Sequence, residues 1–391
     1  MLERVLQGLK NPSFTIDWLL FSAAFFLVAA GLITMNSFVG ENYFFERQIV
    51  WTIISVCVFF TLASFDYRFL RNTNVIVAIF LSMVVLLLLV FVFGEVVKGA
   101  QSRFDLGGFA VQPADPAKLV LILVLAKYFT RRHIEIAHIR HILISGMYAF
   151  ILFALVFLQP DFGSAIILAA TWLGMVLVSG ISKKHLAAVF LTGATIFSML
   201  WFAPVHNILG TEEPVLKDYQ KQRIMTFLNP LADLQGAGYN AYQSTIAVGS
   251  GQFFGKGIGY GTQSKLQFLP EYETDFIFAA FAEEWGFAGV IILFIVFGIL
   301  IWRILDAAVK GATNFETLFG VGVAVLFVSH FVVHVGMNIG LLPVTGTTIP
   351  FMSYGGSHLL TEFAALGILM GMRRYARTRH REDTQTELIG V

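Results

Sequence analysis

Residues 268–286 run Phe-Leu-Pro-Glu-Tyr-Glu-Thr-Asp-Phe-Ile-Phe-Ala-Ala-Phe-Ala-Glu-Glu-Trp-Gly, where a polar segment turns into an apolar helix. Three acids, Asp275, Glu283 and Glu284, lie at or inside the membrane span predicted here. An ionisable side chain inside a membrane is costly and usually faces a cavity or a partner. Asp275 is therefore a candidate functional group, or an acid that stabilises the positive end of the helix dipole. The sequence leaves both interpretations open.

Helical geometry separates the three carboxylates. The spacing turns Glu283 by about 80° from Asp275 and sets it about 12 Å deeper along an ideal helix, while Glu284 points to roughly the opposite side. Neither can form a compact pair with Asp275. We expect both glutamates to support helix packing, each with a polar partner.

The composition indicates a protein that crosses the membrane many times. Hydrophobic residues make up 57% of the chain and charged residues 13%, whereas soluble proteins carry about 25% charged residues. A net charge of +1 gives no reason to expect nucleic-acid binding. The single cysteine, Cys57, lies in an apolar run, which excludes a disulfide framework and a thiolate metal site. The apolar run after residues 1–12 is full length, which predicts a retained first span and not a cleaved signal peptide.

We predict an all-α polytopic membrane protein with ten transmembrane helices, because a span needs about 20 mainly apolar residues. One integral membrane domain then covers residues 1–391, with a large outer loop at 205–274 between the seventh and eighth helices. The cytoplasmic tail, 374–391, is expected to be disordered after Arg381. The predicted spans are 17–37, 48–64, 74–94, 112–130, 140–158, 161–180, 186–204, 275–302, 315–339 and 357–373.

Lysine and arginine concentrate in every second connection between the spans. Cytoplasmic loops carry this excess, so the alternation predicts that both termini are cytoplasmic. The clusters of polar residues, Asp275 among them, then lie on the outer side. The basic residues that set the orientation are Arg4, Lys10, Arg68, Arg71, Lys127, Arg131, Arg132, Arg140, Lys183, Lys184, Arg303, Lys310, Arg373, Arg374, Arg377, Arg379 and Arg381.

Asp115 and Lys118 begin the fourth span three residues apart, so they can meet on one helical face. Asp115 can instead cap the helix, with Pro116 at its first position. Lys118 lies inside the apolar run and needs a partner or water.

Three further polar clusters lie on the outer side. Asp161, in the turn 159–163, can cap the sixth span. The charges of 218–223 can serve a site or form a solvated face. Glycine and proline in 338–358 predict irregular backbone that lines a cavity, and His358 there is best explained as a core histidine with a partner. A carboxylate, a lysine and an arginine near one outer cavity suit an anionic, lipid-linked substrate.

These stretches carry a resemblance that covers nearly the whole chain, from Trp18 to about Arg374. The chain resembles the SEDS family (shape, elongation, division and sporulation), and its rod-shape branch more than its division branch. The motifs are Lys98-Gly-Ala-Gln101, Gln112-Pro113 with Lys118, Gln159-Pro-Asp-Phe-Gly163, Tyr219-Gln-Lys-Gln-Arg223, Gly236-Ala-Gly-Tyr239, Gln243-Ser244, Gly255-Lys-Gly257, Phe268-Leu-Pro-Glu271, Thr274-Asp275-Phe276 and Ser353-Tyr-Gly-Gly-Ser357.

The resemblance implies a peptidoglycan glycosyltransferase of the bacterial inner membrane. Such proteins polymerise lipid II on the outer face and work with a class B penicillin-binding protein. The family's essential aspartate falls on Asp275, and its acid–lysine pair falls on Asp115 and Lys118. The other substrate-binding candidates are Gln101, Arg223, Gln243, Ser244, Glu271, Thr274 and Ser353, and the structural turns use Gln159, Pro160, Asp161, Gly355 and Gly356.

The chain departs from the family pattern at several positions. Asp115 stands where the family usually has glutamate, and Pro116 where it has an aliphatic residue. His358 stands where a small residue is usual. In addition, Ser102-Arg103 replaces an Arg-Trp pair, and Thr347-Thr348 replaces a more apolar stretch.

The hypothesis for the mechanism makes Asp275 the general base that deprotonates the acceptor sugar hydroxyl. Lys118, Arg223 or a divalent cation such as Mg²⁺ or Mn²⁺ would stabilise the leaving undecaprenyl pyrophosphate, and no organic cofactor is expected. The alternatives are a lipid II flippase and a non-catalytic scaffold for the penicillin-binding protein. The inner halves of most spans are apolar, which favours chemistry at the outer side over transport. The scaffold interpretation gives no function to Lys118 and Asp275, two charged residues in or at the membrane.

Overall fold

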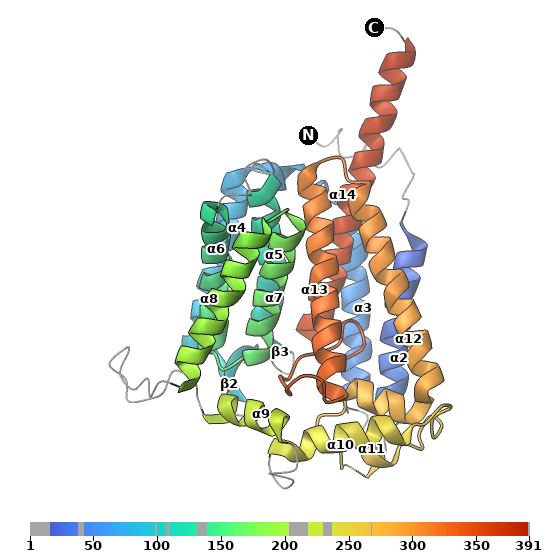
Figure 1. Cartoon of the computed structure of the whole chain (residues 1–391). Helices are drawn as coiled ribbons and strands as arrows, with labels where there is room; N and C mark the ends of the chain where they lie inside the picture. The colour runs from blue at the N-terminus through green and yellow to red at the C-terminus, as the bar shows by residue number, and fades with distance from the viewer. Residues whose placement is uncertain are drawn as a thin grey trace.

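The protein is described here from a computed structural model of the chain. It covers residues 16–37, 43–97, 100–105, 107, 110–130, 139–202, 218–229, 237–266 and 268–389. Long helices run side by side, shorter helices lie across one end of the bundle, and the last helix projects from the other end (Figure 1). The motif residues Lys98 and Gly236 and the basic residues Arg4, Lys10, Arg131 and Arg132 lie outside the described residues.

Each predicted span corresponds to one long helix. The six helices α2, α3, α4, α6, α12 and α13 are long and apolar enough to cross a membrane, and α7 is a shorter apolar helix. The long helices are α2 (Trp18–Asn36), α3 (Tyr43–Ser64), α4 (Thr73–Phe93), α5 (Ala114–Thr130), α6 (Ile139–Leu158), α7 (Phe162–Val178), α8 (Lys183–Phe202), α12 (Ile277–Val309), α13 (Asn314–Asn338) and α14 (Gly356–Ile389). The shorter ones are η1 (Tyr67–Arg71), α9 (Asp218–Leu228), α10 (Ala237–Ser250) and α11 (Thr262–Lys265).

Helix packing places the chain's polar segments at one end of a shared core. α14 packs along α3, α12 packs against α2 and α13, and α5 packs against α4, α7 and α13. α5 is buried along most of its length, whereas apolar side chains such as Leu81 on α4 and Leu143 on α6 stay exposed, as expected where helices face lipid. At the opposite end Asp17 caps α2 and pairs with Arg303 and Arg373, which joins α2, α12 and α14.

The connection between α4 and α5 contains an antiparallel sheet of β1 (Glu95–Val97), β2 (Ala100–Asp105) and β3 (Ala110–Val111), in that order. The strands are too short to show a clear alternating pattern in the sequence. The tail expected to be disordered after Arg381 continues α14 to Ile389. Residues 372–389 contain neither glycine nor proline, so nothing in that stretch ends the helix.

The span predicted at 275–302 is a broken helix. Within α12, Gly286 has φ 64° and ψ −169°, so the helix stops and restarts there. The interrupted backbone is satisfied by the segment 252–257. The N–H groups of Phe287 and Ala288 donate to the carbonyls of residues 252 and 253, and the N–H groups of residues 256 and 257 donate to the carbonyls of Glu283 and Glu284, at 2.9–3.0 Å. A break at membrane depth requires such partners because lipid offers none.

Glu283 and Glu284 hold the same segment through their side chains. The Glu283 carboxylate accepts from Lys256 Nζ at 2.6 Å and from the N–H of Thr262 at 2.9 Å. The Glu284 carboxylate accepts from Ser37 Oγ at 2.6 Å and from the N–H of Gly259 at 2.9 Å. The expectation that each glutamate serves packing through a polar partner is confirmed.

Replacement of Gly286 by alanine is expected to destabilise the protein. A Cβ at this position would lie 2.2 Å from the backbone nitrogen of Gly255, and a left-handed φ costs a non-glycine residue about 1–2 kcal/mol. Thermal unfolding in detergent, followed by size-exclusion chromatography, should show a lower midpoint for Gly286→Ala. Gly298→Ala is the control, because a Cβ there meets no described atom within 4 Å. Equal midpoints for the two variants would contradict this account of the break.

Candidate active site

Asp275 lies in a tight turn immediately before α12. The N–H groups of Thr274, Asp275 and Phe276 all donate to the carbonyl of Glu271, at 3.2, 3.0 and 3.1 Å. Glu271 itself adopts a left-handed φ of 54°. The N-cap residue of α12 is Phe276, and helical backbone begins at Ile277. Asp275 is therefore a turn residue ahead of the helix and does not cap it.

Three consecutive carbonyls of this turn are bonded to other parts of the bundle. Tyr354 N–H donates to Glu273 at 2.8 Å, Ser353 Oγ donates to Thr274 at 2.8 Å, and Asn338 Nδ2 donates to Asp275 at 3.0 Å. Asn338 ends α13, and residues 353 and 354 precede α14. The backbone that carries the Asp275 carboxylate is thus fixed by two other helices.

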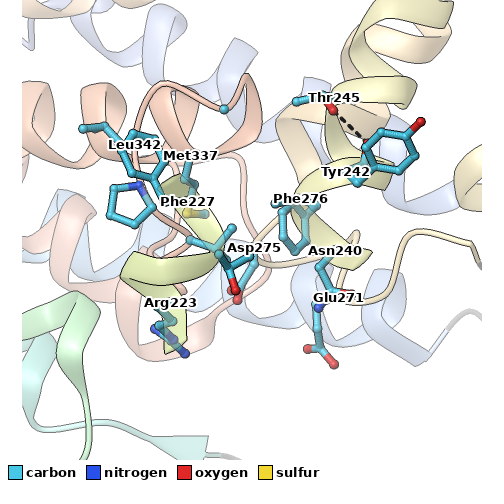
Figure 2. A pocket seen from close by; sticks show the side chains of 15 residues that line it. Arg223, Phe227, Asn240, Tyr242, Thr245, Glu271, Asp275, Phe276, Met337 and Leu342 are labelled. Carbon is cyan, nitrogen blue, oxygen red and sulfur yellow. Dashed lines mark hydrogen bonds between the residues drawn. The ribbon is translucent and has the colours of Figure 1, made fainter. Parts of the chain in front are cut away.

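An apolar cavity of about 510 Å³ opens on one side of Asp275. Its walls include Phe227, Phe276 and Leu342, with Asp275 and Arg223 among them (Figure 2). Arg223, on α9, donates through Nη1 to the carbonyl of Thr345 at 2.8 Å. This bond ties α9 to the extended segment 343–349 beside the carboxylate.

A polar cavity of about 610 Å³ opens on the other side, and Glu271 and Asp275 line both cavities. The candidates Thr274, Asp115 and Lys118 also line the polar cavity. Lys118 and Arg223, expected near one cavity, are thus divided between the two sides of Asp275. The lining of the polar cavity holds more acids than bases: Glu95, Asp105, Asp115, Asp161, Glu271, Glu273 and Asp275 against Arg47, Arg103, Lys118, His330 and His358.

The predicted contact between Asp115 and Lys118 forms. Asp115 lies in the first turn of α5, and its Oδ1 is 3.0 Å from Lys118 Nζ. Both residues are buried, with 6% and 3% of their surface exposed. The shorter acid and Pro116 are compatible with the pair, because Asp115 points along the helix toward the next turn. In the described structure the Lys118 ammonium group is paired with Asp115. This pairing limits how strongly Lys118 can bind a substrate phosphate.

The other candidates support the backbone. Asp161 is the N-cap of α7, where it accepts from Ser164 N–H at 3.0 Å and from Gln112 Nε2 at 2.5 Å. The Gln101 amide, on β2, donates to the carbonyl of Gly94, the C-cap of α4, at 2.8 Å. Ser244, fully buried on α10, donates to the carbonyl of Asn338 at 2.8 Å.

The turn residues around 159 and 355 also serve packing. Gln159 Nε2 donates to the carbonyl of Leu87 at 2.8 Å, next to Pro160 in the turn before α7. Gly355 N–H donates to Gln48 Oε1 at 3.2 Å. A Cβ at Gly356 would lie 1.9 Å from the Trp51 ring, so only glycine allows this approach of α14 to α3. Gln243 is half-buried on α10.

Several residues of the site were not chosen as candidates from the sequence, although Tyr354 lies in the motif 353–357 and Asn338 begins the stretch 338–358. Tyr354 and Glu273 line the polar cavity, and Asn338 holds the Asp275 turn. Burial raises the pKa of Tyr354, and burial also raises the pKa of Tyr272, with the neighbouring Glu273 adding to the effect. Both phenols therefore stay protonated at neutral pH and can donate hydrogen bonds. Such roles depend on contacts between distant segments, which the sequence does not display.

No metal cage is formed by the described part of the chain: it contains no group of three histidine, cysteine, aspartate or glutamate side chains close enough to hold an ion. A Mg²⁺ ion needs fewer protein ligands, because it usually keeps several waters and binds through one or two carboxylates plus substrate phosphates. The acidic lining beside Asp275 offers such carboxylates. The residues therefore fit an ion that arrives with a phosphate, and do not fit a resident one.

Comparison with known proteins identifies the family. The profile of the family described as FtsW/RodA/SpoVE, cell cycle protein, matches residues 11–378. The chain belongs to this family. The resemblance to the SEDS proteins inferred from the motifs is thereby confirmed.

Relatives in the family match over most of their length. The peptidoglycan glycosyltransferase MrdB of Escherichia coli strain K12 is 37% identical over 299 residues, covering 76% of this chain and 78% of that protein. The stage V sporulation protein E of Bacillus subtilis strain 168 is 31% identical over 372 residues, covering 92% and 98%.

Solved structures of the family share the fold. A chain from a peptidoglycan synthase complex has a TM-score of 0.77 with 28% identity, covering 93% of this chain and 99% of that one. The rod shape determining protein RodA of Thermus thermophilus has a TM-score of 0.68 with 27% identity, covering 93% and 98%. The chain is thus a multi-pass helical membrane protein with a RodA-like fold.

Replacement of Asn338 by leucine is expected to loosen the Asp275 turn. The leucine is similar in size but removes the donor to Asp275 and the acceptor that Asn338 Oδ1 offers to Ala279 N–H at 3.1 Å. An unpaired buried polar group costs about 1–3 kcal/mol. The unfolding midpoint should fall and glycan polymerisation should fall with it. Asn74→Leu, at an exposed position on α4, should change neither, and a fully active Asn338→Leu protein would contradict the role assigned to this side chain.

Proposed function

We propose that this protein is a peptidoglycan glycosyltransferase that polymerises lipid II at the outer face of the bacterial cytoplasmic membrane during cell elongation. The observation that carries the proposal is the position of Asp275, whose side chain lines two cavities at once. A polymerase must bring two lipid-linked sugars to one catalytic group, and two cavities that meet at one carboxylate allow this. The relative named peptidoglycan glycosyltransferase MrdB supports the reaction class.

We further propose that α5, α7, α8 and α14 complete a set of ten membrane spans with α2, α3, α4, α6, α12 and α13. They run alongside the six long apolar helices (Figure 1). Arg68 and Arg71 lie in η1, Lys310 lies between α12 and α13, and Arg303 lies near the end of α12. Arg71 pairs with Glu316 at the start of α13, and Arg303 pairs with Asp17 at the start of α2. Basic residues thus gather at this end of the bundle, which favours it as cytoplasmic. Asp275, at the opposite end with α9 to α11, then faces the outer side.

In the proposed reaction Asp275 acts as the general base. It takes the proton from the 4-hydroxyl of the acceptor sugar, and that oxygen attacks the anomeric carbon of the donor. The new glycosidic bond forms as the bond to undecaprenyl pyrophosphate breaks, with inversion at the anomeric carbon. A general base works only within hydrogen-bonding reach of the proton that it removes. The hydrogen bonds to the carbonyls of Glu273, Thr274 and Asp275 hold the backbone that carries the carboxylate, which supports this role.

Positive charge is needed to stabilise the leaving pyrophosphate. The carboxylates that line the polar cavity would repel this anion and so increase the positive charge required. Lys118 and, from the other cavity, Arg223 are the basic candidates. A divalent cation carried in with the pyrophosphate would supply further charge neutralisation. We also propose a class B penicillin-binding protein as the partner, a proposal supported by the similarity to a chain of a peptidoglycan synthase complex.

Replacement of Asp275 by asparagine should abolish polymerisation in protein that stays folded. The amide keeps the shape but cannot accept the proton, and loss of a general base lowers the rate by about 10²–10⁴-fold. Glycan chains made from labelled lipid II, with the partner present, are the measurement. Asp306→Asn, which removes a carboxylate from the other end of α12, is the matched control and should stay active.

The same reconstitution separates the alternatives. Liposomes that contain labelled lipid II are scored for glycan chains and for lipid crossing between leaflets. Polymerisation without accelerated crossing supports the enzyme. Crossing without polymerisation would establish a flippase, and the absence of both would leave a scaffold for the partner.

Removal of divalent cations is expected to lower the polymerisation rate. With more carboxylates than lysine and arginine residues around the polar cavity, a pyrophosphate group meets repulsion that a bridging cation relieves. Activity should fall after treatment with EDTA and return with Mg²⁺ or Mn²⁺. Full activity in excess chelator would show that the protein's own cations suffice.

A further inference from the structure

A buried histidine lies against the acid–lysine pair of the polar cavity. His358, on α14, lines the cavity and has 6% of its surface exposed. Its Nδ1 is 3.6 Å from Asp115 Oδ1, and its Nε2 is 2.9 Å from Glu362 Oε1. The structure confirms the core histidine with a partner that the sequence predicted. It places the ring between two buried carboxylates, one from α5 and one from its own helix.

Carboxylates on both sides of the ring define its charge. Nearby negative charges favour the charged form of a histidine. With a carboxylate oxygen 3.6 Å from Nδ1 and another 2.9 Å from Nε2, both within ion-pair distance, His358 fits the imidazolium form. The other oxygen of Glu362 accepts from Phe351 N–H at 2.8 Å, so this acid is anchored as well.

The neighbouring histidine does not share this charge. His330, on α13, has its ring centroid 4.9 Å from that of His358. Its Nδ1 is 3.1 Å from the carbonyl of Thr348, which acts only as an acceptor and so fixes the proton on Nδ1. A second positive ring beside His358 would be repelled. Within this cluster of four side chains, the negative charges of Asp115 and Glu362 therefore balance the positive charges of Lys118 and His358.

This balance bears on how Lys118 can serve the reaction. Lys118 is 3.0 Å from Asp115, and a lysine that left Asp115 would strand a buried carboxylate, which is strongly destabilising. His358 already faces the same Asp115 oxygen. A flexible four-carbon side chain can therefore turn toward the cavity while the imidazolium keeps Asp115 paired.

We propose that His358 is a positioning residue for substrate binding, which as an imidazolium neutralises Asp115 and Glu362 so that Lys118 is free to bind the pyrophosphate of the lipid-linked substrate. The inference rests on the proposed function, because it takes the pyrophosphate from the proposed substrate. It assigns to α14 a part in phosphate binding without any contact between His358 and the substrate.

The test compares variants that change the charge balance in opposite directions. His358→Gln keeps the size and one donor but leaves the group with one excess negative charge. Loss of one charge-assisted contact should raise the KM for lipid II, and the inhibition constant of farnesyl pyrophosphate, about tenfold, with kcat nearly unchanged. The second substitution in His358→Gln/Glu362→Gln removes the excess carboxylate and should bring both constants back toward the wild-type values.

The double variant separates charge from packing. If His358 only fills space, a second substitution beside it adds damage and gives no recovery. Glu362→Gln alone leaves one excess positive charge and should tighten farnesyl pyrophosphate inhibition, so the proposal stays testable if His358→Gln does not fold. The control is His141→Gln, which removes a buried imidazole that contacts Tyr128 OH at 2.9 Å on α5, and it should leave both constants unchanged.

The outcomes distinguish a failure of the proposed function from a failure of the role assigned to His358. A wild-type protein that does not polymerise lipid II overturns the proposed function itself. An active wild type with unchanged constants in His358→Gln, or with no recovery in the double variant, overturns the role of His358 alone. Recovery in the double variant supports it.

Discussion

The structure depends on the pairing of non-helical backbone at one end of the helical bundle. Lipid offers no hydrogen bonds, so every irregular segment at membrane depth needs partners within the protein. Here the break at Gly286 is bonded to residues 252–257, and the turn 271–276 is bonded to Asn338 and to residues 353 and 354. These bonds connect α10, α12, α13 and α14 at one place, called here the joint, and they fix the position of Asp275.

That joint places one carboxylate between two cavities. The turn projects Asp275 between an apolar cavity under α9 and α10 and a polar cavity beside α5 and α14. The two cations expected to work together lie on opposite sides of it, Arg223 in the first and Lys118 in the second. The polar side is acidic, so its few positive charges have to be shared between the protein's own carboxylates and a bound phosphate. In the role proposed for His358, its imidazolium would neutralise part of this acidic lining.

The helices were predictable because their cause is local. About 20 apolar residues per span and basic residues in alternate connections mark each long helix, and the observed bounds agree with the predicted ones within a few residues for α2, α4, α6, α7 and α13. The break at Gly286 was missed because glycine and its flanking residues fit a continuous apolar helix. Only the segment 252–257, more than 25 positions earlier, makes the break stable.

The sequence by itself determined the fold class and the family and marked Asp275 as the candidate general base, since apolar runs, basic loops and short motifs are properties of neighbouring residues. Tertiary structure alone decided that His358 reaches Asp115 on another helix as well as Glu362 on its own. It also decided that Asn338 holds the turn that carries Asp275. The physical reason is that a buried charge or carbonyl is satisfied by whichever group packing brings within about 3 Å, and packing unites residues from helices that are far apart in the chain.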